Sequence, residues 1–257
     1  MRHHAEYVMG TVVSFDIRPG LASPAAVDAA LASACAVLHE VDDMFSTWKP
    51  DSQLSQLRRG ELRVDEVSVE VDEVIDRCVY ALRASGGWFD PWSIAGGFDP
   101  TGLVKGWAAD RALVELRCAG IDAAMINAGG DIATFGTPTP GKTWRIGVRD
   151  PLDASTLRVV AEIDGAIATS GAYERGEHVR NPRTGEAARE LTSATVTGPE
   201  LALADALATG LFAAGAAGLQ HIDAIVGYEA FIIDADGVGH ATSGFPTAPD
   251  VPDLAPA

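Results

Sequence analysis

The fold is decided around residues 201–212, Leu-Ala-Leu-Ala-Asp-Ala-Leu-Ala-Thr-Gly-Leu-Phe, which are apolar at nearly every position. This composition predicts a helix that is apolar on all faces, and such a helix is normally buried. Asp205 and Thr209 lie one helical turn apart, so their oxygens can face the same point. A buried carboxylate is costly unless it is paired or holds a cation.

Asp205 and Thr209 have two interpretations at this stage. A carboxylate and a hydroxyl at this spacing are hard oxygen ligands of the kind that Mg²⁺ uses together with substrate phosphates. Alternatively, Asp205 lies partly exposed near the start of the helix, where the helix dipole favours a negative charge. The helix by itself favours the second interpretation.

Length and composition describe an ordinary globular chain. Its 257 residues can bury a large core, and 47% of them are hydrophobic and 21% charged. The formal net charge of −17 disfavours binding to nucleic acid or to an anionic membrane, because both would repel the chain. A ligand that contains phosphate would need a local cation, which is a first indication of a divalent metal.

The cysteines, the N-terminal segment and the most hydrophobic stretch of the sequence indicate where in the cell the protein is expected. Cys35, Cys78 and Cys118 are far apart and each falls in an apolar helical pattern, so we expect buried free thiols. Residues 1–18 lack a charged segment followed by an apolar run, and we expect a cytoplasmic protein without an export or lipoprotein signal. The window 201–219 contains an aspartate and many small residues, which favours a buried helix over stable membrane insertion.

Hydrophobic periodicity predicts a single compact α+β domain of two lobes, with mixed or antiparallel sheets packed with helices. Thr197 and Glu200 match a capping box, which predicts Thr197 as the N-cap of the central helix. The expected helices are 24–44, 71–82, 103–117, 201–212 and 216–222, with a short helical turn after the loop that begins at 45 and a shaped loop at 88–102. The expected strands are 7–17, 122–127, 131–135, 144–149, 157–163, 166–170, 191–196 and 229–233.

Residues 136–143, Gly-Thr-Pro-Thr-Pro-Gly-Lys-Thr, match the P-loop pattern at every defined position. A P-loop needs a row of backbone N–H donors that leads into a helix. Pro138 and Pro140 have no N–H to donate, and the residues that follow alternate like a strand. We therefore interpret this segment as a hairpin connection.

Three other stretches place polar groups where they could serve a ligand. Residues 127–131, Asn-Ala-Gly-Gly-Asp, join two predicted strands and are typical of a tight turn or of close approach to a ligand. Asp99 and Lys105 flank a helix start, where the lysine could reach a phosphate or lie in solvent. His178 lies in the turn-rich segment 177–185 and is the best-placed histidine for acid–base chemistry.

Taken in order, these motifs and their neighbours resemble the ApbE family, the FAD:protein FMN transferases, over almost the whole chain. The matching blocks are Met9-Gly10-Thr11, Phe45-Ser46-Thr47-Trp48, Asp51-Ser52-Gln53-Leu54-Ser55, Gly87-Trp88-Phe89-Asp90, residues 99–110, residues 127–131, Thr169-Ser170-Gly171-Ala172-Tyr173-Glu174, residues 178–185 and residues 205–209. The resemblance implies FAD as substrate, Mg²⁺ as cofactor, and transfer of FMN to a Thr or Ser hydroxyl of an acceptor flavoprotein with release of AMP. The flavin transferase domain would span residues 1–245, followed by a loose Pro/Ala-rich tail at 246–257.

Matched residue by residue, the resemblance also implies a site. Mg²⁺ would be held by Asp205, Thr209 and the backbone carbonyls of Gly102 and Ala208, and would offset charge on the pyrophosphate. His178 is our hypothesis for the base that takes the proton of the acceptor hydroxyl. The FAD site would be lined by Met9, Trp48, Trp88, Phe89, Asp90, Asp99, Lys105 and Val179.

The sequence departs from the family pattern in several places. The loop between Asp90 and Asp99 is shorter than in many members, and Asn181 stands where an aspartate is expected. Trp48 and Trp88 are bulkier than expected, and could stack on a flavin or adenine ring. Two rival functions stay open: an FAD pyrophosphatase that uses water as the acceptor, and a non-catalytic FAD-binding protein. A P-loop nucleotidase is disfavoured by the two prolines.

Overall fold

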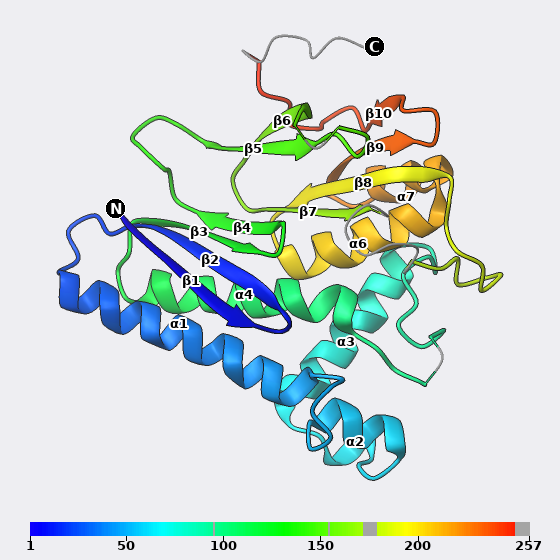
Figure 1. Ribbon diagram of the computed structural model, residues 1–257, viewed down its shortest axis with the longest axis horizontal. Coiled ribbons are helices and arrows are strands. Elements are labelled where there is room, and N and C mark those ends of the chain that lie inside the picture. Colours follow the sequence, from blue (N-terminus) through cyan, green and yellow to red (C-terminus); the bar gives the residue numbers. More distant parts are fainter. Residues whose placement is uncertain (95, 154, 172–178, 250–257) are drawn as a thin grey trace.

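The computed structural model describes residues 1–94, 96–153, 155–171 and 179–249. An eight-stranded sheet, in which all neighbouring strands are antiparallel, organises the chain (Figure 1). Its strands, in spatial order, are β1 (Arg2–Val8), β2 (Thr11–Arg18), β3 (Ala123–Ala128), β4 (Asp131–Phe135), β7 (Ala166–Gly171), β8 (Leu191–Gly198), β9 (Glu229–Asp234) and β10 (Gly239–Ala241). A separate two-stranded sheet is formed by β5 (Trp144–Arg149) and β6 (Leu157–Ile163).

The helices fall into two groups along the chain. The described helices between β2 and β3 are α1 (Pro24–Phe45), α2 (Gln53–Arg59), η1 (Val64–Glu66), α3 (Val69–Ala84) and α4 (Thr101–Cys118). Between β8 and β9 lie α6 (Leu201–Ala214), η2 (Ala216–Gly218) and α7 (Leu219–Asp223). Because α4 packs on both α1 and α6, these three helices form one layer against the large sheet, whereas α2 packs on α1 away from the sheet (Figure 1). The α+β class predicted from the sequence is confirmed.

Alternate residues of the large sheet serve two different cores. Ala124 and Ile126 of β3 pack in the main core with the helices. Ala123 of the same strand and Ile132 of β4 pack instead with Trp144 and other residues of β5 and β6. Successive side chains of a strand point to opposite faces, so helices cover one face and the β5–β6 hairpin covers part of the other. This double coverage explains why every residue of β4 is buried.

The central helix α6 is buried on nearly every face, as its composition predicts; only Leu203 and Thr209 are partly accessible. It runs between α4 and the strands β7 and β8. Gly106 allows this packing, because a Cβ atom there would lie 2.6 Å from the carbonyl oxygen of Leu201. Any larger residue at 106 would therefore push α4 away from the start of α6.

The predicted capping box is wrong. Thr197 lies inside β8, and Glu200 is the N-cap residue but makes no side-chain cap hydrogen bond. The cap comes instead from α4: Asp110 accepts hydrogen bonds from the backbone N–H groups of Leu201 and Ala202, at 3.0 and 2.9 Å. These are two of the donors that the first turn of a helix leaves without an intrahelical partner.

The single strand predicted at 7–17 is also wrong. The chain reverses at Met9 and Gly10, both with positive φ (53° and 70°), and forms the β1–β2 hairpin. Positive φ at both central residues is the geometry of a type I′ turn, whose twist matches paired strands. The segment 136–143 connects β4 to β5 and leads into a strand, so it lacks the helix that a P-loop needs. The predicted hairpin connection is wrong, because β4 and β5 lie in different sheets and do not pair with each other.

Three further expectations can be compared with the structure. Cys78 is buried, but Cys35 is only partly buried and Cys118 is exposed, so the prediction of three buried thiols is wrong for the last two. The tail is not loose at its start: Ala248 is buried and donates a backbone hydrogen bond to Val160 of β6 at 2.8 Å. The division of the chain into a domain at 1–245 and a tail stays a prediction.

Within the described part of the chain, α1 alone has the length and apolar composition of a membrane-spanning helix. Its buried residues, among them Ala34, Leu38 and Val41, follow one stripe and belong to the main core. A core helix with one buried stripe passes the same test of length and composition, so this feature is weak evidence for a membrane span.

Candidate functional site

A pocket of about 680 Å³ opens where α4 and α6 meet the ends of β4 and β7. Its floor carries Lys105 of α4, Asp131 of β4, and Asp205 and Thr209 of α6. Its walls come from residues 88–94 and from residues 179–185. The pocket therefore draws on segments that are far apart in the sequence and that the sheet and helices bring together.

Lys105 lies between two carboxylates on the pocket floor. Its Nζ is 3.0 Å from Oδ2 of Asp205 and also contacts Oδ2 of Asp131. All three side chains are largely buried, with exposures of 15%, 9% and 8% for Lys105, Asp205 and Asp131. Burial lowers the pKa of Lys105, but Asp205 and Asp131 more than offset this and hold the pKa above its usual range. The lysine is therefore a fixed positive charge at neutral pH.

Asp131 is positioned by the sheet as well as by the lysine. Its Oδ1 accepts a hydrogen bond from the backbone N–H of Thr169 on β7, at 2.8 Å. It follows the turn at Gly129 and Gly130, where the Oδ1 of Asn127 accepts a hydrogen bond from the N–H of Gly130 at 2.8 Å. Since Gly129 also lines the pocket, this segment is both a tight turn and a place where backbone approaches the ligand space.

Thr209 and Gly102 meet beside the carboxylate of Asp205. The Oγ1 of Thr209 is 3.3 Å from the Oγ of Ser170. A Cβ atom at Gly102 would lie 3.4 Å from Oγ1 of Thr209 and 3.2 Å from the ring of Phe89, so glycine keeps this corner open. Carboxylate, hydroxyl and backbone carbonyl oxygens are the donors that Mg²⁺ prefers, and this donor set fits the ion.

Aromatic and cationic groups form the outer wall. The guanidinium of Arg183 lies 4.0 Å from the ring centroid of Trp88, a cation–π contact that holds the indole at the pocket edge. Phe89 is 5% exposed, and its backbone N–H donates to the Oγ of Ser85 at 2.9 Å. A planar ring entering the pocket would meet an aromatic wall that is already fixed in place.

The structure brings most of the predicted site residues together in one pocket. Those that line the pocket are Trp88, Phe89, Asp90, Asp99, Gly102, Lys105, Val179, Asp205 and Thr209. Asp90 and Asp99 also shape their loop, since each accepts a backbone hydrogen bond, from Trp92 and Thr101 respectively. Ala208 is fully buried within α6. His178 lies outside the described residues.

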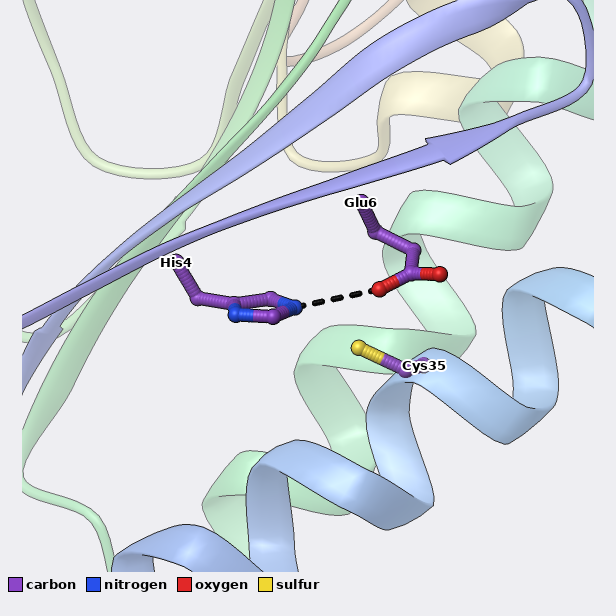
Figure 2. A group of neighbouring side chains, drawn as sticks. All are labelled: His4, Glu6 and Cys35. Atoms are coloured by element: carbon purple, nitrogen blue, oxygen red, sulfur yellow. Dashed lines mark hydrogen bonds and ion pairs between the residues drawn. The ribbon is translucent and has the colours of Figure 1, made fainter.

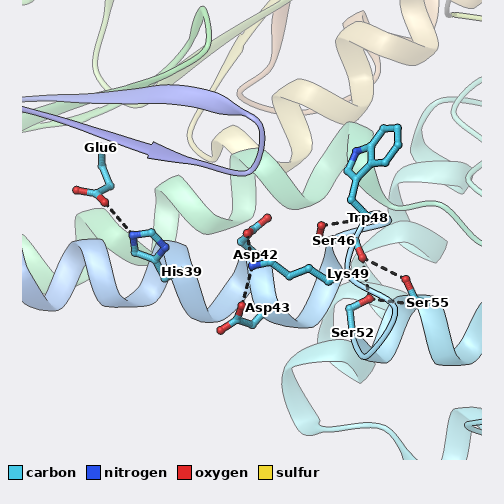
Figure 3. Close-up of polar contacts among 9 residues, drawn as sticks. All are labelled: Glu6, His39, Asp42, Asp43, Ser46, Trp48, Lys49, Ser52 and Ser55. Atoms are coloured by element: carbon cyan, nitrogen blue, oxygen red, sulfur yellow. Dashed lines mark hydrogen bonds and ion pairs between the residues drawn. The ribbon is translucent and has the colours of Figure 1, made fainter.

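Two predicted flavin-site residues are not among those that line this pocket. Met9 occupies the β1–β2 turn and packs against the main core. Trp48 is 92% exposed in the segment after α1, where its backbone N–H donates to Ser46 (Figure 3). Conversely, Asp131 and Ser170 lie in the pocket, although the sequence alone assigned them no role. The sequence did contain an indication that Asp131 belongs to a site, because a carboxylate at the start of a buried strand needs a partner.

The fold and pocket define an α+β protein with a deep ligand site in which one lysine bridges two buried carboxylates. Residues 9–96 and 93–232 match the ApbE family, well over half of the sequence. The chain belongs to the ApbE family. In three dimensions it is similar to the flavin transferase ApbE from Vibrio cholerae, with a TM-score of 0.82, 24% identity, and coverage of 95% of this chain and 97% of that one.

Other relatives extend this result. The ApbE protein of Thermotoga maritima superposes with a TM-score of 0.80 at 20% identity, covering 94% of this chain and 97% of that chain. A FAD:protein FMN transferase of Rhodobacter capsulatus is 35% identical over 171 residues, which are 58% of this chain but only 32% of that protein. A FAD:protein FMN transferase of Treponema pallidum is 26% identical over 82% of this chain and 78% of that protein. The match thus spans about a third of the Rhodobacter relative.

Proposed function

We propose that this protein is a Mg²⁺-dependent FAD:protein FMN transferase. It takes FAD as substrate, moves FMN to a Thr or Ser hydroxyl of an acceptor flavoprotein in the cytoplasm, and releases AMP. The observation that carries this proposal is the buried arrangement of Lys105 with Asp131 and Asp205, next to the Thr209 hydroxyl and to Gly102. A cation and several hard oxygen donors in one pocket suit a pyrophosphate with its metal.

Each group would have a definite task. Asp205, Thr209 and the carbonyls of Gly102 and Ala208 would hold Mg²⁺, which supplies neutralisation of the negative charge on the pyrophosphate. Lys105 would donate a hydrogen bond to a phosphate oxygen, while Asp131 keeps the ammonium in position. The aromatic wall at Trp88 and Phe89 would hold a flat ring and exclude water from the reacting phosphorus.

The bond changes follow from the substrate. The acceptor hydroxyl oxygen bonds to the phosphorus on the FMN side, and the bond from that phosphorus to the AMP oxygen breaks. A base takes the hydroxyl proton, and His178 keeps that role as a hypothesis. His178→Ala should lower the transfer rate strongly, and a full rate in this variant would exclude His178 as the base.

The direct test mixes the purified chain with FAD, Mg²⁺ and an acceptor protein whose Thr or Ser lies in a short Gly-containing segment. The expected products are covalent flavin on the acceptor and AMP in equal amounts. Free FMN and AMP with an unmodified acceptor would instead identify an FAD pyrophosphatase. FAD binding without AMP would identify a non-catalytic binding protein.

A matched pair of variants locates the metal. Asp205→Asn should reduce Mg²⁺-dependent AMP release by roughly 100-fold or more, because it removes a charge that acts in the buried pocket. Asp223→Asn is the control, since Asp223 is exposed on α7 and does not line the pocket. Equal activity in the two variants would place the metal elsewhere.

A further inference from the structure

A second cluster of ligand-type side chains joins β1 to α1, apart from the flavin pocket. His4 and Glu6 lie two residues apart on β1 and therefore on the same face, and Cys35 of α1 points toward them (Figure 2). The imidazole, carboxylate and thiol each offer one atom, and these atoms all lie within 4.8 Å of one another. The Nε2 of His4 is 3.1 Å from Oε2 of Glu6.

A fourth group stands beside these three. His39 lies one helical turn after Cys35 on α1, and its Nε2 is 2.8 Å from Oε1 of Glu6 (Figure 3). Glu6 is thus held between two imidazoles, one from its own strand and one from the helix. His39 is half exposed and contacts the Glu6 oxygen that does not contact His4, so it is the nearest candidate for a fourth ligand.

The charges of the cluster suit a cation. The carboxylate of Glu6 lies within hydrogen-bond distance of both imidazoles and supplies the negative charge of the cluster. Cys35 is only partly buried, so its thiol can release its proton to solvent when a cation binds. A cation would replace that proton, which leaves to solvent, and would lie between a thiolate and a carboxylate.

We propose that His4, Glu6, Cys35 and His39 form a binding site for Zn²⁺. Nitrogen, sulfur and carboxylate oxygen are the ligands of tetrahedral zinc, whereas the oxygen-only donors around Asp205 suit Mg²⁺. The site is structural in kind, because its ligands come from an edge strand and a helix and none lines the flavin pocket. The ion fastens β1, the first strand of the sheet, to the surface of α1 in addition to the ion pair between Arg2 and Asp28.

Cobalt gives a direct readout, since thiolate bound to Co²⁺ produces a charge-transfer absorption band in the near ultraviolet. The metal-free chain is titrated with Co²⁺, and one equivalent should produce the band and Zn²⁺ should then displace it. Cys35→Ser should abolish the band and weaken Zn²⁺ binding at least ~10-fold. Cys118→Ser, which removes an exposed thiol on α4, should change neither result.

Two more variants test whether Zn²⁺ binds the proposed ligands and not a neighbouring histidine. Glu6→Gln keeps the thiol and the shape of the side chain, and should also weaken Zn²⁺ binding at least ~10-fold. His3→Ala removes the neighbouring histidine on the opposite face of β1 and should leave Zn²⁺ affinity unchanged. A wild-type chain without the band, or equal bands in wild type and Cys35→Ser, would overturn the proposal. Flavin transfer does not enter these measurements.

Discussion

At the scale of single residues, Lys105 is the central charge of the pocket between α4 and α6. Its ammonium contacts Asp205 and Asp131, and all three side chains are largely buried. Removing one partner from a buried charged group leaves the others uncompensated, which commonly costs about 3–5 kcal/mol. We therefore expect Lys105→Met to lower the free energy of unfolding by ~3 kcal/mol at pH 7, as measured by urea denaturation.

A double variant separates charge from packing. Lys105→Met with Asp131→Asn removes one of the two facing negative charges and should recover part of the lost stability. If the double variant were as unstable as the sum of the two single variants, the loss would come from packing and not from charge. Under the proposed function, Lys105→Met and the double variant should both lack flavin transfer, because each removes the ammonium that is proposed to bind the phosphate.

The sequence predicts part of this pocket because helical spacing is a local property. Asp205 and Thr209 are one turn apart, so this pair can be expected from the sequence alone. Gly102 was named only through the family resemblance, because the helix was expected to begin at 103, whereas α4 begins at Thr101. Asp131 is harder, because it reaches Lys105 across 26 residues of chain through the pairing of β3 with β4. Trp48 does not line the described pocket, and its direction could not be expected from the sequence because it lies in no periodic element; its role at the FAD site stays a prediction.

At the scale of elements, α6 depends on another helix for its cap. Asp110 lies 91 residues before Leu201, yet its carboxylate binds the first N–H groups of α6. A capping box is a local rule, so the sequence pattern at Thr197 and Glu200 gave the wrong cap. Glu200 instead pairs with Arg77 of α3 at 2.9 Å, which ties a third helix to the same corner.

The cap at Asp110 should be visible in the pH dependence of stability. Burial raises the pKa of Asp110 from 3.8 to about 6 in the folded chain, although the two backbone hydrogen bonds oppose this. Between these values the folded state holds more protons than the unfolded state, so this contribution to stability falls as pH rises from about 4 to about 6. The loss is up to ~3 kcal/mol.

Asp110→Asn removes this titration. Because other carboxylates also titrate, the informative quantity is the difference between wild type and variant in chemical denaturation at each pH. Relative to Asp110→Asn, the wild type should lose stability over this range. For the control variant Asp76→Asn, at an exposed position of α3, the free energy of unfolding should follow the same pH dependence as that of the wild type. A constant difference between wild type and Asp110→Asn would show that Asp110 has the same pKa in both states.

At the scale of the whole molecule, the sequence predicts the individual helices and strands better than it predicts which of them pair or pack together. The helices and most strands follow from periodicity, and the α+β class follows from their order. The β1–β2 hairpin was missed because Met9 adopts a positive φ that side chains other than glycine seldom take. That β5 and β6 leave the large sheet and cover its other face depends on pairing between distant residues, which no local pattern encodes.

The two faces of the large sheet therefore carry separate cores. Trp144 anchors the smaller one: its side chain is 5% exposed, and its Nε1 donates to the carbonyl of Gly136 at 3.0 Å. The guanidinium of Arg18 lies 5.5 Å from the ring centroid and joins β2 to the same cluster. The helices α4 and α6, which line the pocket, pack on the opposite face, in the larger core.

This separation predicts how the molecule opens when the smaller core is damaged. Trp144→Ala should lower the free energy of unfolding by about 3–5 kcal/mol, whereas Trp48→Ala, at an exposed tryptophan, should change it by less than ~0.5 kcal/mol. In hydrogen exchange, the amides of β5, β6 and residues 245–248 should lose protection first, because they share the damaged cluster. Amides of α6 should still exchange only when the whole chain unfolds, since that helix packs in the other core. Equal loss of protection in α6 and β5 would mean that the two cores unfold as one cooperative unit.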